Sequence, residues 1–134
     1  MRKFEIKLPN GIIISSKLLE TEVAIIDDVR KNDMGNGYVL YCMPPVELNN
    51  EKIVFNLCFY NGALNSLNMS IYNPDLYGHG WNDFSEEKER ACAKETENWL
   101  AINGYKTGKY SWGEIWAGYD AKSGSGHAGV RYAL

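Results

Sequence analysis

The segment from residue 52 to residue 71 constrains the fold most, because its pattern is that of an antiparallel β-hairpin. Hydrophobic and polar side chains alternate on both sides of Asn61-Gly62, a dipeptide typical of a tight turn between two strands. The hydrophobic positions are Ile53, Phe55, Leu57, Phe59, Leu67, Met69 and Ile71. Such a hairpin belongs to an antiparallel sheet with one buried face and one solvated face.

Other segments fit strands of the same kind of sheet. Near the N-terminus, Phe4, Ile6 and Leu8 alternate with charged residues and are followed by the turn signal Pro9-Asn10-Gly11. The predicted strands outside the central hairpin are residues 4–8, 12–14, 38–43, 109–119 and 127–133. A short loop joins the last two strands, which predicts a terminal hairpin.

Two helices are expected. Residues 20–31 carry hydrophobic side chains at a spacing of three, which favours a short helix, although their β-branched residues leave a strand open. The stretch 73–84 is expected to be irregular. Ser85 is then a suitable N-cap for a long helix that ends at about Ile102, next to Gly104.

These elements predict an α+β fold in which residues 1–134 form a single domain. Nearly all strand-to-strand links are short turns. We therefore expect an antiparallel β-meander sheet of about six to seven strands, with one long and one short helix packed on one face. The order of the strands across the helices stays open.

Composition argues against several functional classes. The chain has 17 acidic and 14 basic residues, a net charge of −3, so no nucleic-acid partner is expected. No uncharged apolar run approaches the roughly 18 residues of a membrane span, so no membrane partner is expected either. Charged residues and Pro9 interrupt any signal-peptide core, which predicts a cytoplasmic location. The cysteines, Cys42, Cys58 and Cys92, are expected to be small buried side chains.

Charge is unevenly distributed along the chain. Residues 1–19 carry four bases and one acid, residues 20–33 five acids and two bases, and residues 83–97 six acids and three bases. Both predicted helices are therefore acidic. Two interpretations stay open: solvated helix faces, or an acidic surface that binds a basic partner and speeds its association.

Few residues suggest catalysis or metal binding. The two histidines, His79 and His127, do not lie in a recognised metal-ligand spacing. No fingerprint of a phosphate-binding loop, a serine hydrolase or a zinc protease occurs. We therefore expect a protein that is not an enzyme and has no metal and no cofactor. The catalytic alternative is a hydrolase that uses Asp75, His79 and Asp120.

The tryptophans are more informative. Trp112 and Trp116 would share one face of the strand predicted at 109–119. This face either packs against the long helix and Trp99 or forms an exposed platform of the kind that anchors partners or stacks on sugars. The second possibility supports an alternative function, in which Trp81, Trp112 or Trp116 binds a small carbohydrate-like ligand.

A series of landmarks lies between residues 81 and 132, within a segment of about residues 50–134. The landmarks are Trp81-Asn82-Asp83-Phe84-Ser85, Glu89, Trp99-Leu100, Trp112-Gly113-Glu114-Ile115, Tyr119-Asp120-Ala121-Lys122 and Tyr132. They resemble the W-x-x-F-S-x-x-x-E, W-G-x-I and Y-D-x-K pattern of a loosely defined group of small bacterial α+β proteins. That group is similar to the immunity proteins of bacterial toxin systems. The resemblance implies a protein-binding role and carries over no catalytic residue.

We therefore predict a non-catalytic binding protein, a cytoplasmic immunity protein that covers the active site of a basic toxin domain. It is expected to be a monomer or a homodimer. The predicted partner-binding residues are Trp81, Asp83, Glu86, Glu87, Trp112, Trp116 and Asp120.

Overall fold

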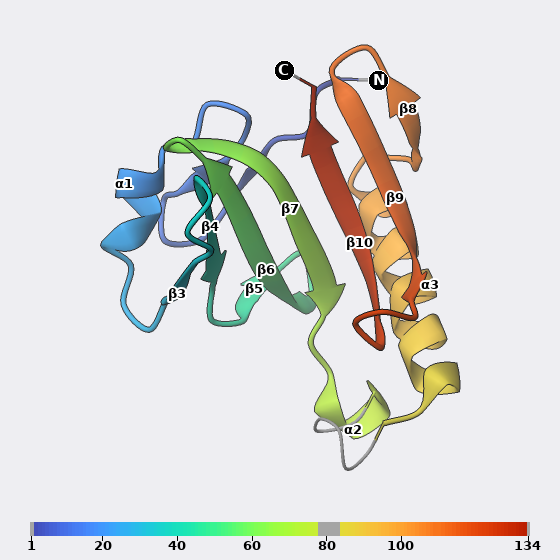
Figure 1. Ribbon diagram of the computed structural model, residues 1–134. Coiled ribbons are helices and arrows are strands. Elements are labelled where there is room, and N and C mark those ends of the chain that lie inside the picture. The colour runs from blue at the N-terminus through green and yellow to red at the C-terminus, as the bar shows by residue number, and fades with distance from the viewer. Residues whose placement is uncertain (1, 78–83, 134) are drawn as a thin grey trace.

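Strands prevail in the part of the chain that the computed structural model describes, residues 2–77 and 84–133 (Figure 1). The elements are β1 (Ile6–Lys7), β2 (Ile13–Ile14), α1 (Glu20–Ala24), β3 (Arg30–Asp33), β4 (Tyr38–Cys42), β5 (Val46–Leu48), β6 (Glu51–Tyr60), β7 (Ala63–Ile71), α2 (Pro74–Tyr77), α3 (Glu86–Ile102), β8 (Gly108–Tyr110), β9 (Gly113–Asp120) and β10 (Ser125–Tyr132). The predicted α+β class with antiparallel strands is confirmed, although the strands are more numerous than expected.

The large sheet has the strand order β3-β4-β6-β7-β10-β9-β8, and β5 also pairs with β6. Strands β1 and β2 form a separate two-stranded sheet. Every strand pair is antiparallel. The order departs from a simple meander after β7, because β7 pairs with β10 and not with β8. The sheet therefore brings the central hairpin β6–β7 against the terminal hairpin β9–β10.

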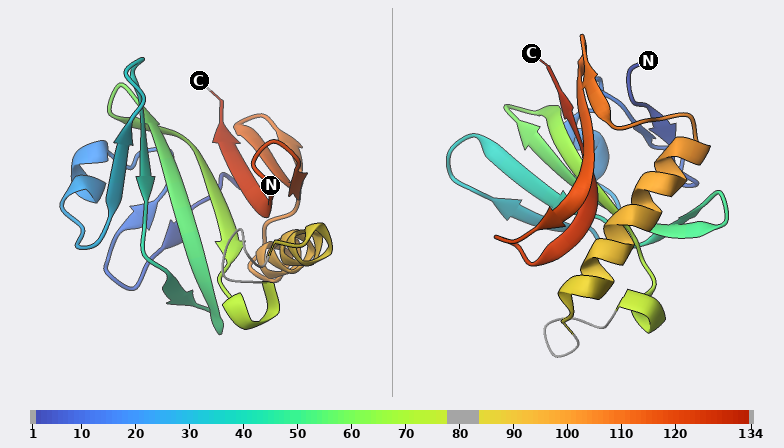
Figure 2. Two further views of the ribbon diagram at one scale, coloured as in Figure 1. Left: turned by 60° about the horizontal axis from the view of Figure 1, so that its bottom comes forward. Right: turned by 90° about the vertical axis from the view of Figure 1, so that its right-hand side faces the viewer.

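One face of the large sheet, which we call the helix face, forms the core. Register partners on five neighbouring strands make a continuous buried row across it: Tyr41, Leu57, Leu67, Val130 and Ile115. Helix α3 packs on β7, β9 and β10 on this side, as Figure 2 shows from two further directions. Val23 of α1 and Phe4 of the N-terminal segment join the same core.

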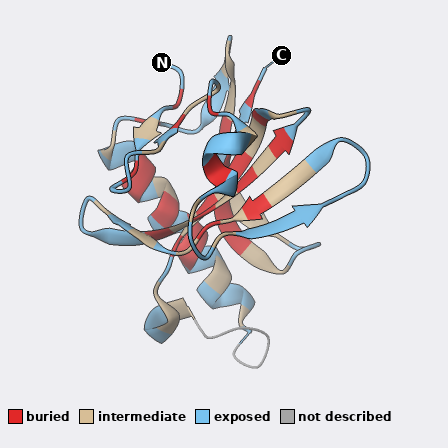
Figure 3. Ribbon diagram, turned by 90° about the vertical axis from the view of Figure 1, so that its left-hand side faces the viewer, coloured by how far each residue is buried: buried red, intermediate tan, exposed pale blue. Residues whose placement is uncertain are grey.

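The helix predicted over residues 20–31 is wrong after Ala24. Asp28 has a left-handed φ of 63°, which ends the helical path and turns the chain. Residues Arg30–Asp33 then form β3, an edge strand that pairs with β4 and is exposed along its whole length (Figure 3). The β-branched residues for which a strand was the alternative prediction flank this turn. Pairing with β4 then stabilises residues 30–33 as a strand.

The strand predicted over residues 109–119 is two strands. Ser111 and Trp112 form a turn between β8 and β9, and Gly113 follows with φ of 149°. A Cβ on Gly113 would lie 1.9 Å from the carbonyl oxygen of Arg131, so only glycine fits this close approach to β10. Strand β5 and helix α2 have no counterpart in the sequence prediction.

The long helix agrees with its prediction. The Ser85 hydroxyl accepts a hydrogen bond from the Lys88 N–H at 3.3 Å, and Gly104 follows the helix with φ of 91°. Within the described ranges, no helix is long and apolar enough to cross a membrane.

Helix α3 approaches β10 closely at Gly126. A Cβ at this position would lie 1.7 Å from the carbonyl oxygen of Glu89 and 3.3 Å from the side chain of Ala93. The absence of a side chain at Gly126 therefore sets the distance between helix and strand.

We expect Gly126→Ala to destabilise the fold by about 2 kcal/mol or more, because the added methyl group forces α3 and β10 apart. The measurement is chemical denaturation at neutral pH. Gly118→Ala on β9 is the matched control, since a Cβ there meets nothing within 4 Å and should change stability by less than about 1 kcal/mol. Equal stability of the two variants would contradict the close approach.

Candidate functional site

The face of the large sheet opposite α3, which we call the open face, has no helix packed on it among the described elements. In Figure 1 this face is toward the viewer, and β9 and β10 pass in front of α3. A row of register partners crosses it: Cys42, Asn56, Asn68, Gly129 and Trp116. All of them except Gly129 keep part of their surface exposed, so this row is the solvated counterpart of the buried row on the helix face.

Trp116 lies on the open face directly above Gly129. A Cβ on Gly129 would be 2.3 Å from Cζ2 of the Trp116 indole, so the ring occupies the space that a side chain would fill. The ring also meets His127 edge-on, at 4.9 Å between centroids and 68° between planes. The indole is thus held by its neighbours while 38% of the residue surface remains exposed.

The same face carries further residues of the types that anchor protein interfaces. Tyr38 and Tyr60 form an aromatic pair with centroids 4.5 Å apart, and both are exposed. Between this pair and Trp116, Arg131 binds Glu114 across the β9–β10 pair at 2.6 Å. The open face therefore combines exposed aromatic rings with small polar side chains.

Strands β7 and β10 separate at one end of the open face. Their register ends at the pair Met69–Ala128. Beyond it, the Ile71 N–H donates to the Thr96 hydroxyl at 3.1 Å, and the Gly126 N–H donates to the Glu89 carboxylate at 3.0 Å. Side chains of α3 thus replace the hydrogen bonds that the two strands would otherwise make to each other.

A pocket of about 440 Å³ opens where the two strands separate. We call it the split-strand pocket. Its lining is mixed: Met69, Ile71, Pro74 and Cys92 contribute apolar surface, and the polar part consists of amides, hydroxyls, carboxylates and one imidazole, from Asn56, Asn68, Ser70, Tyr77, Glu89, Asp120, Ser123, Ser125 and His127. Its volume lies within the roughly 300–1,000 Å³ typical of small-molecule sites.

His127 is a buried polar residue of this lining, with 9% of its surface exposed. Its Nδ1 lies 3.0 Å from the Ser125 hydroxyl, which in turn lies 2.9 Å from the Ser123 hydroxyl. Burial lowers the pKa of His127, against the attraction of Asp120 and Glu89. The imidazole is therefore neutral at pH 7.

Asp120 stands at the rim of the pocket, at the end of β9. Its carboxylate accepts the Lys122 N–H at 3.0 Å, and this bond lowers the pKa of Asp120. By accepting this backbone N–H, the carboxylate starts the β9–β10 turn. At neutral pH the pocket holds the ionised Asp120 beside an uncharged imidazole, an arrangement that suits binding of a positive group.

The structure brings together only some of the predicted partner-binding residues. Trp116 and Asp120 share the open face of β9, and the helix residue Glu89 lines the pocket below them. Trp112 lies at the opposite end of β9, half-buried and stacked on Tyr110 with ring centroids 5.3 Å apart. The two tryptophans therefore differ: Trp112 packs against Tyr110 and Tyr132, whereas Trp116 is exposed on the open face.

The acidic residues predicted for the long helix lie in its first turn. Glu86 and Glu87 are exposed, and Glu86 binds Arg90 at 2.8 Å. Trp81 and Asp83 lie outside the described residues, as does His79 of the hydrolase alternative. In the described ranges, no group of three or more His, Cys, Asp or Glu residues is arranged to hold a metal ion.

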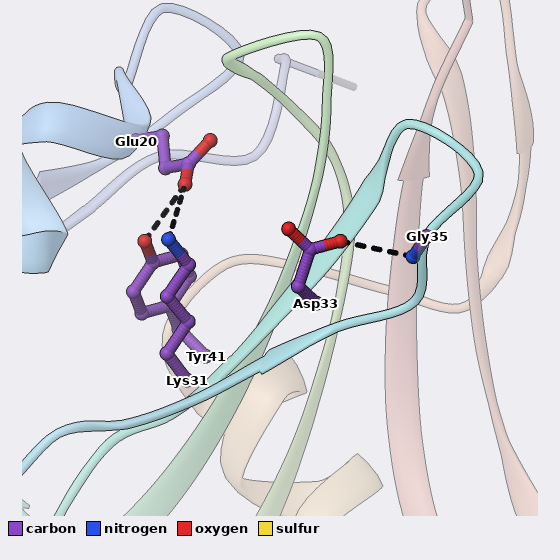
Figure 4. A network of polar contacts seen from close by, with 5 residues as sticks. All are labelled: Glu20, Lys31, Asp33, Gly35 and Tyr41. Carbon is purple, nitrogen blue, oxygen red and sulfur yellow. Dashed lines mark hydrogen bonds and ion pairs between the residues drawn. The ribbon is translucent and has the colours of Figure 1, made fainter.

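The acidic segment 20–33 is used largely for internal contacts (Figure 4). Glu20 accepts a hydrogen bond from the Tyr41 hydroxyl at 2.8 Å and lies 3.9 Å from the Lys31 ammonium. Burial, followed by this hydrogen bond, raises the pKa of Tyr41 to about 12. Asp33 accepts the Gly35 N–H at 2.9 Å. These carboxylates hold α1 and β3 in place, which leaves them less suited to a partner.

Sequence reasoning missed Asn56, Asn68, Glu89 and His127 as site residues. Their positions in strands and a helix are ordinary, and no local pattern distinguishes them. The one available signal is alternation, which places both asparagines on the solvated face of the central hairpin.

Comparisons with known proteins show a likeness of fold. No family model and no curated protein matches the chain. Among solved structures, the chain is similar to one from "Rhs1-CT in complex with cognate immunity protein RhsI1", with 17% sequence identity and a TM-score of 0.58. The similarity covers 97% of this chain and 83% of that one.

The lowered pKa of His127 predicts a loss of stability in mild acid. The unfolded chain binds a proton near the ordinary pKa of 6.5, whereas the folded state resists it. The contribution is therefore complete above pH 6.5 and is lost as the pH falls toward the lower folded pKa. Urea denaturation from about pH 7 to about pH 5 should show a smaller pH dependence for His127→Asn than for the original protein. Parallel curves for the two proteins would contradict the buried neutral imidazole.

Proposed function

We propose that this protein is a non-catalytic immunity protein, which binds a bacterial toxin domain and covers its active site. In this proposal it acts in the cytoplasm, and its partner is a basic protein. The binding surface is the open face of the sheet, and Trp116 lies on β9, near one edge of this face.

The observation that carries the proposal is the combination of residues on this uncovered face. Trp116, Tyr38 and Tyr60 are exposed there, beside Arg131 and a row of small polar side chains. Tryptophan, tyrosine and arginine are the residues that most often dominate binding energy in protein complexes. The indole of Trp116 is already fixed above Gly129, so little conformational entropy is lost when a partner covers it.

The fold likeness supports the same proposal. It extends over nearly the whole chain, and the solved structure is itself a complex with a cognate immunity protein. The net charge of −3 agrees with a basic partner, because opposite charges speed association.

The proposal is tested by recovering a tagged copy from the native host at low salt. We expect one stoichiometric partner with a toxin-like C-terminal domain. Expressed alone, that domain should arrest growth, and co-expression of this chain should restore it. Restoration of growth together with a Kd in the nanomolar range supports the proposal. Recovery of no partner at any salt concentration, or of one whose toxicity persists on co-expression, overturns it.

The binding surface is tested with the same partner. Trp116→Ala should weaken binding at least tenfold, about 1.4 kcal/mol, as measured by calorimetry. Ile25→Ala is the matched control, because Ile25 is a large, 83% exposed hydrophobic residue at the C-terminal end of α1 and belongs to no strand of the sheet. Unchanged affinity of Trp116→Ala, with loss of binding in Glu86→Lys or Glu87→Lys, would place the partner on α3 instead.

A second candidate function has one observation in its favour. Trp116 is in contact with His127, which lines the split-strand pocket, and an aromatic ring beside hydrogen-bonding groups suits a carbohydrate-like ligand. A shift of tryptophan fluorescence with members of a sugar library, and no toxin partner, would favour this function over immunity.

A further inference from the structure

We propose that the split-strand pocket is the subsite for one basic side chain, an arginine or a lysine, of the protein partner. This inference rests on the proposed function and names the part of the partner that the open face recognises. It gives the pocket a role that the proposed function alone does not require.

The first argument is charge. Two carboxylates, those of Glu89 and Asp120, line the pocket, and no lysine or arginine is among the described residues of its lining. The nearest arginine of α3, Arg90, is held on another side of the helix, between Glu86 at 2.8 Å and the Tyr119 ring at 4.9 Å. The negative charge of the pocket is therefore not neutralised from within the described part of the molecule.

The second argument is the fixed position of both carboxylates. One oxygen of Glu89 accepts the Gly126 N–H, and one oxygen of Asp120 accepts the Lys122 N–H, each at 3.0 Å. Each carboxylate keeps a second oxygen that can accept hydrogen bonds from a cation. Because backbone bonds already orient these groups, little side-chain entropy is lost on binding.

The third argument is the second ring nitrogen of His127, Nε2. The residue has 9% of its surface exposed and its Nδ1 lies 3.0 Å from the Ser125 hydroxyl, so its hydrogen bond to a described residue uses Nδ1 and not Nε2. In the tautomer that donates Nδ1–H to Ser125, Nε2 is an acceptor, and the residue lines the pocket together with the carboxylates of Glu89 and Asp120. Asn56 and Asn68, register partners on β6 and β7, also line the pocket, and each side-chain amide has an oxygen that can accept a hydrogen bond.

Trp116 does not line the pocket but is in contact with His127, which does. Its ring touches the His127 ring and remains exposed on the open face. A basic side chain that enters the pocket from this face passes the indole, on which a guanidinium group can stack. Arginine therefore fits the site better than lysine.

The test uses the isolated protein and a defined probe, Nα-acetyl-arginine amide, followed by NMR. We expect shifts of the Trp116 indole N–H and of the His127 ring, with a Kd on the order of 1–10 mM, the range of a single side-chain contact. The uncharged citrulline analogue has nearly the same shape and should cause no such shifts. Added salt should weaken the response to arginine amide, since the attraction is between charges.

Two variants remove charge and retain the backbone hydrogen bonds. Asp120→Asn and Glu89→Gln should each raise the Kd of arginine amide several-fold. Asp33→Asn is the matched control, because Asp33 also accepts a backbone N–H, at 2.9 Å from Gly35, but lies outside the pocket. The Kd of arginine amide for the Asp33→Asn variant should equal that for the unchanged protein.

The inference is overturned if arginine amide causes no shifts, if citrulline amide causes equal shifts, or if a neutral sugar shifts Trp116 more strongly. It is also overturned if all three variants bind arginine amide equally well. This titration needs no partner. Failure to find a toxin therefore tests the proposed function alone, whereas failure of the titration with partner binding intact removes only the subsite.

Discussion

The architecture depends on the contact between Glu89 and Gly126, where α3 meets β10. The backbone oxygen of Glu89 occupies the space of the missing Cβ, and its carboxylate accepts the Gly126 N–H. One residue of the helix thus both approaches the strand and satisfies its donor. A buried N–H without a partner would cost about 1–3 kcal/mol, so this bond allows the first residues of β10, before Ala128, to lie apart from β7.

The same helix satisfies the other side of the gap. The Thr96 hydroxyl accepts the Ile71 N–H and donates to the Cys92 carbonyl at 2.8 Å, while the Cys92 thiol donates to the Ile71 carbonyl at 3.5 Å. Burial raises the pKa of the Cys92 thiol to about 11, so it remains protonated and able to donate. The gap between β7 and β10 is therefore a stable part of the fold and not a defect in strand pairing. The pocket follows from it, because two paired strands would leave no such space.

The sequence predicted what local patterns determine. Alternation and Asn61-Gly62 located the central hairpin, and Ser85 and Gly104 located both ends of the long helix. Sequence patterns did not predict the elements whose structure depends on contacts with distant segments. Residues 30–33 form a strand because β4 lies beside them, and the turn at Trp112 is fixed by the approach of Gly113 to Arg131. The partnership of β7 with β10 joins segments about 60 residues apart, which no local pattern encodes.

The candidate site shows the same division. Trp116 and Asp120 could be named from residue type, because exposed tryptophans and turn-forming aspartates are recognisable in a strand pattern. Their environment could not, since the glycine beneath Trp116 and the histidine beside it come from β10 through the register of two strands. The turn between β8 and β9 explains why Trp112 and Trp116, only four residues apart, have different surroundings. A strand of the predicted length would place both rings on one face, but the turn before Gly113 directs Trp112 toward Tyr110 and Tyr132. Trp116 alone is left to the open face, next to the pocket that the separation of β7 and β10 creates.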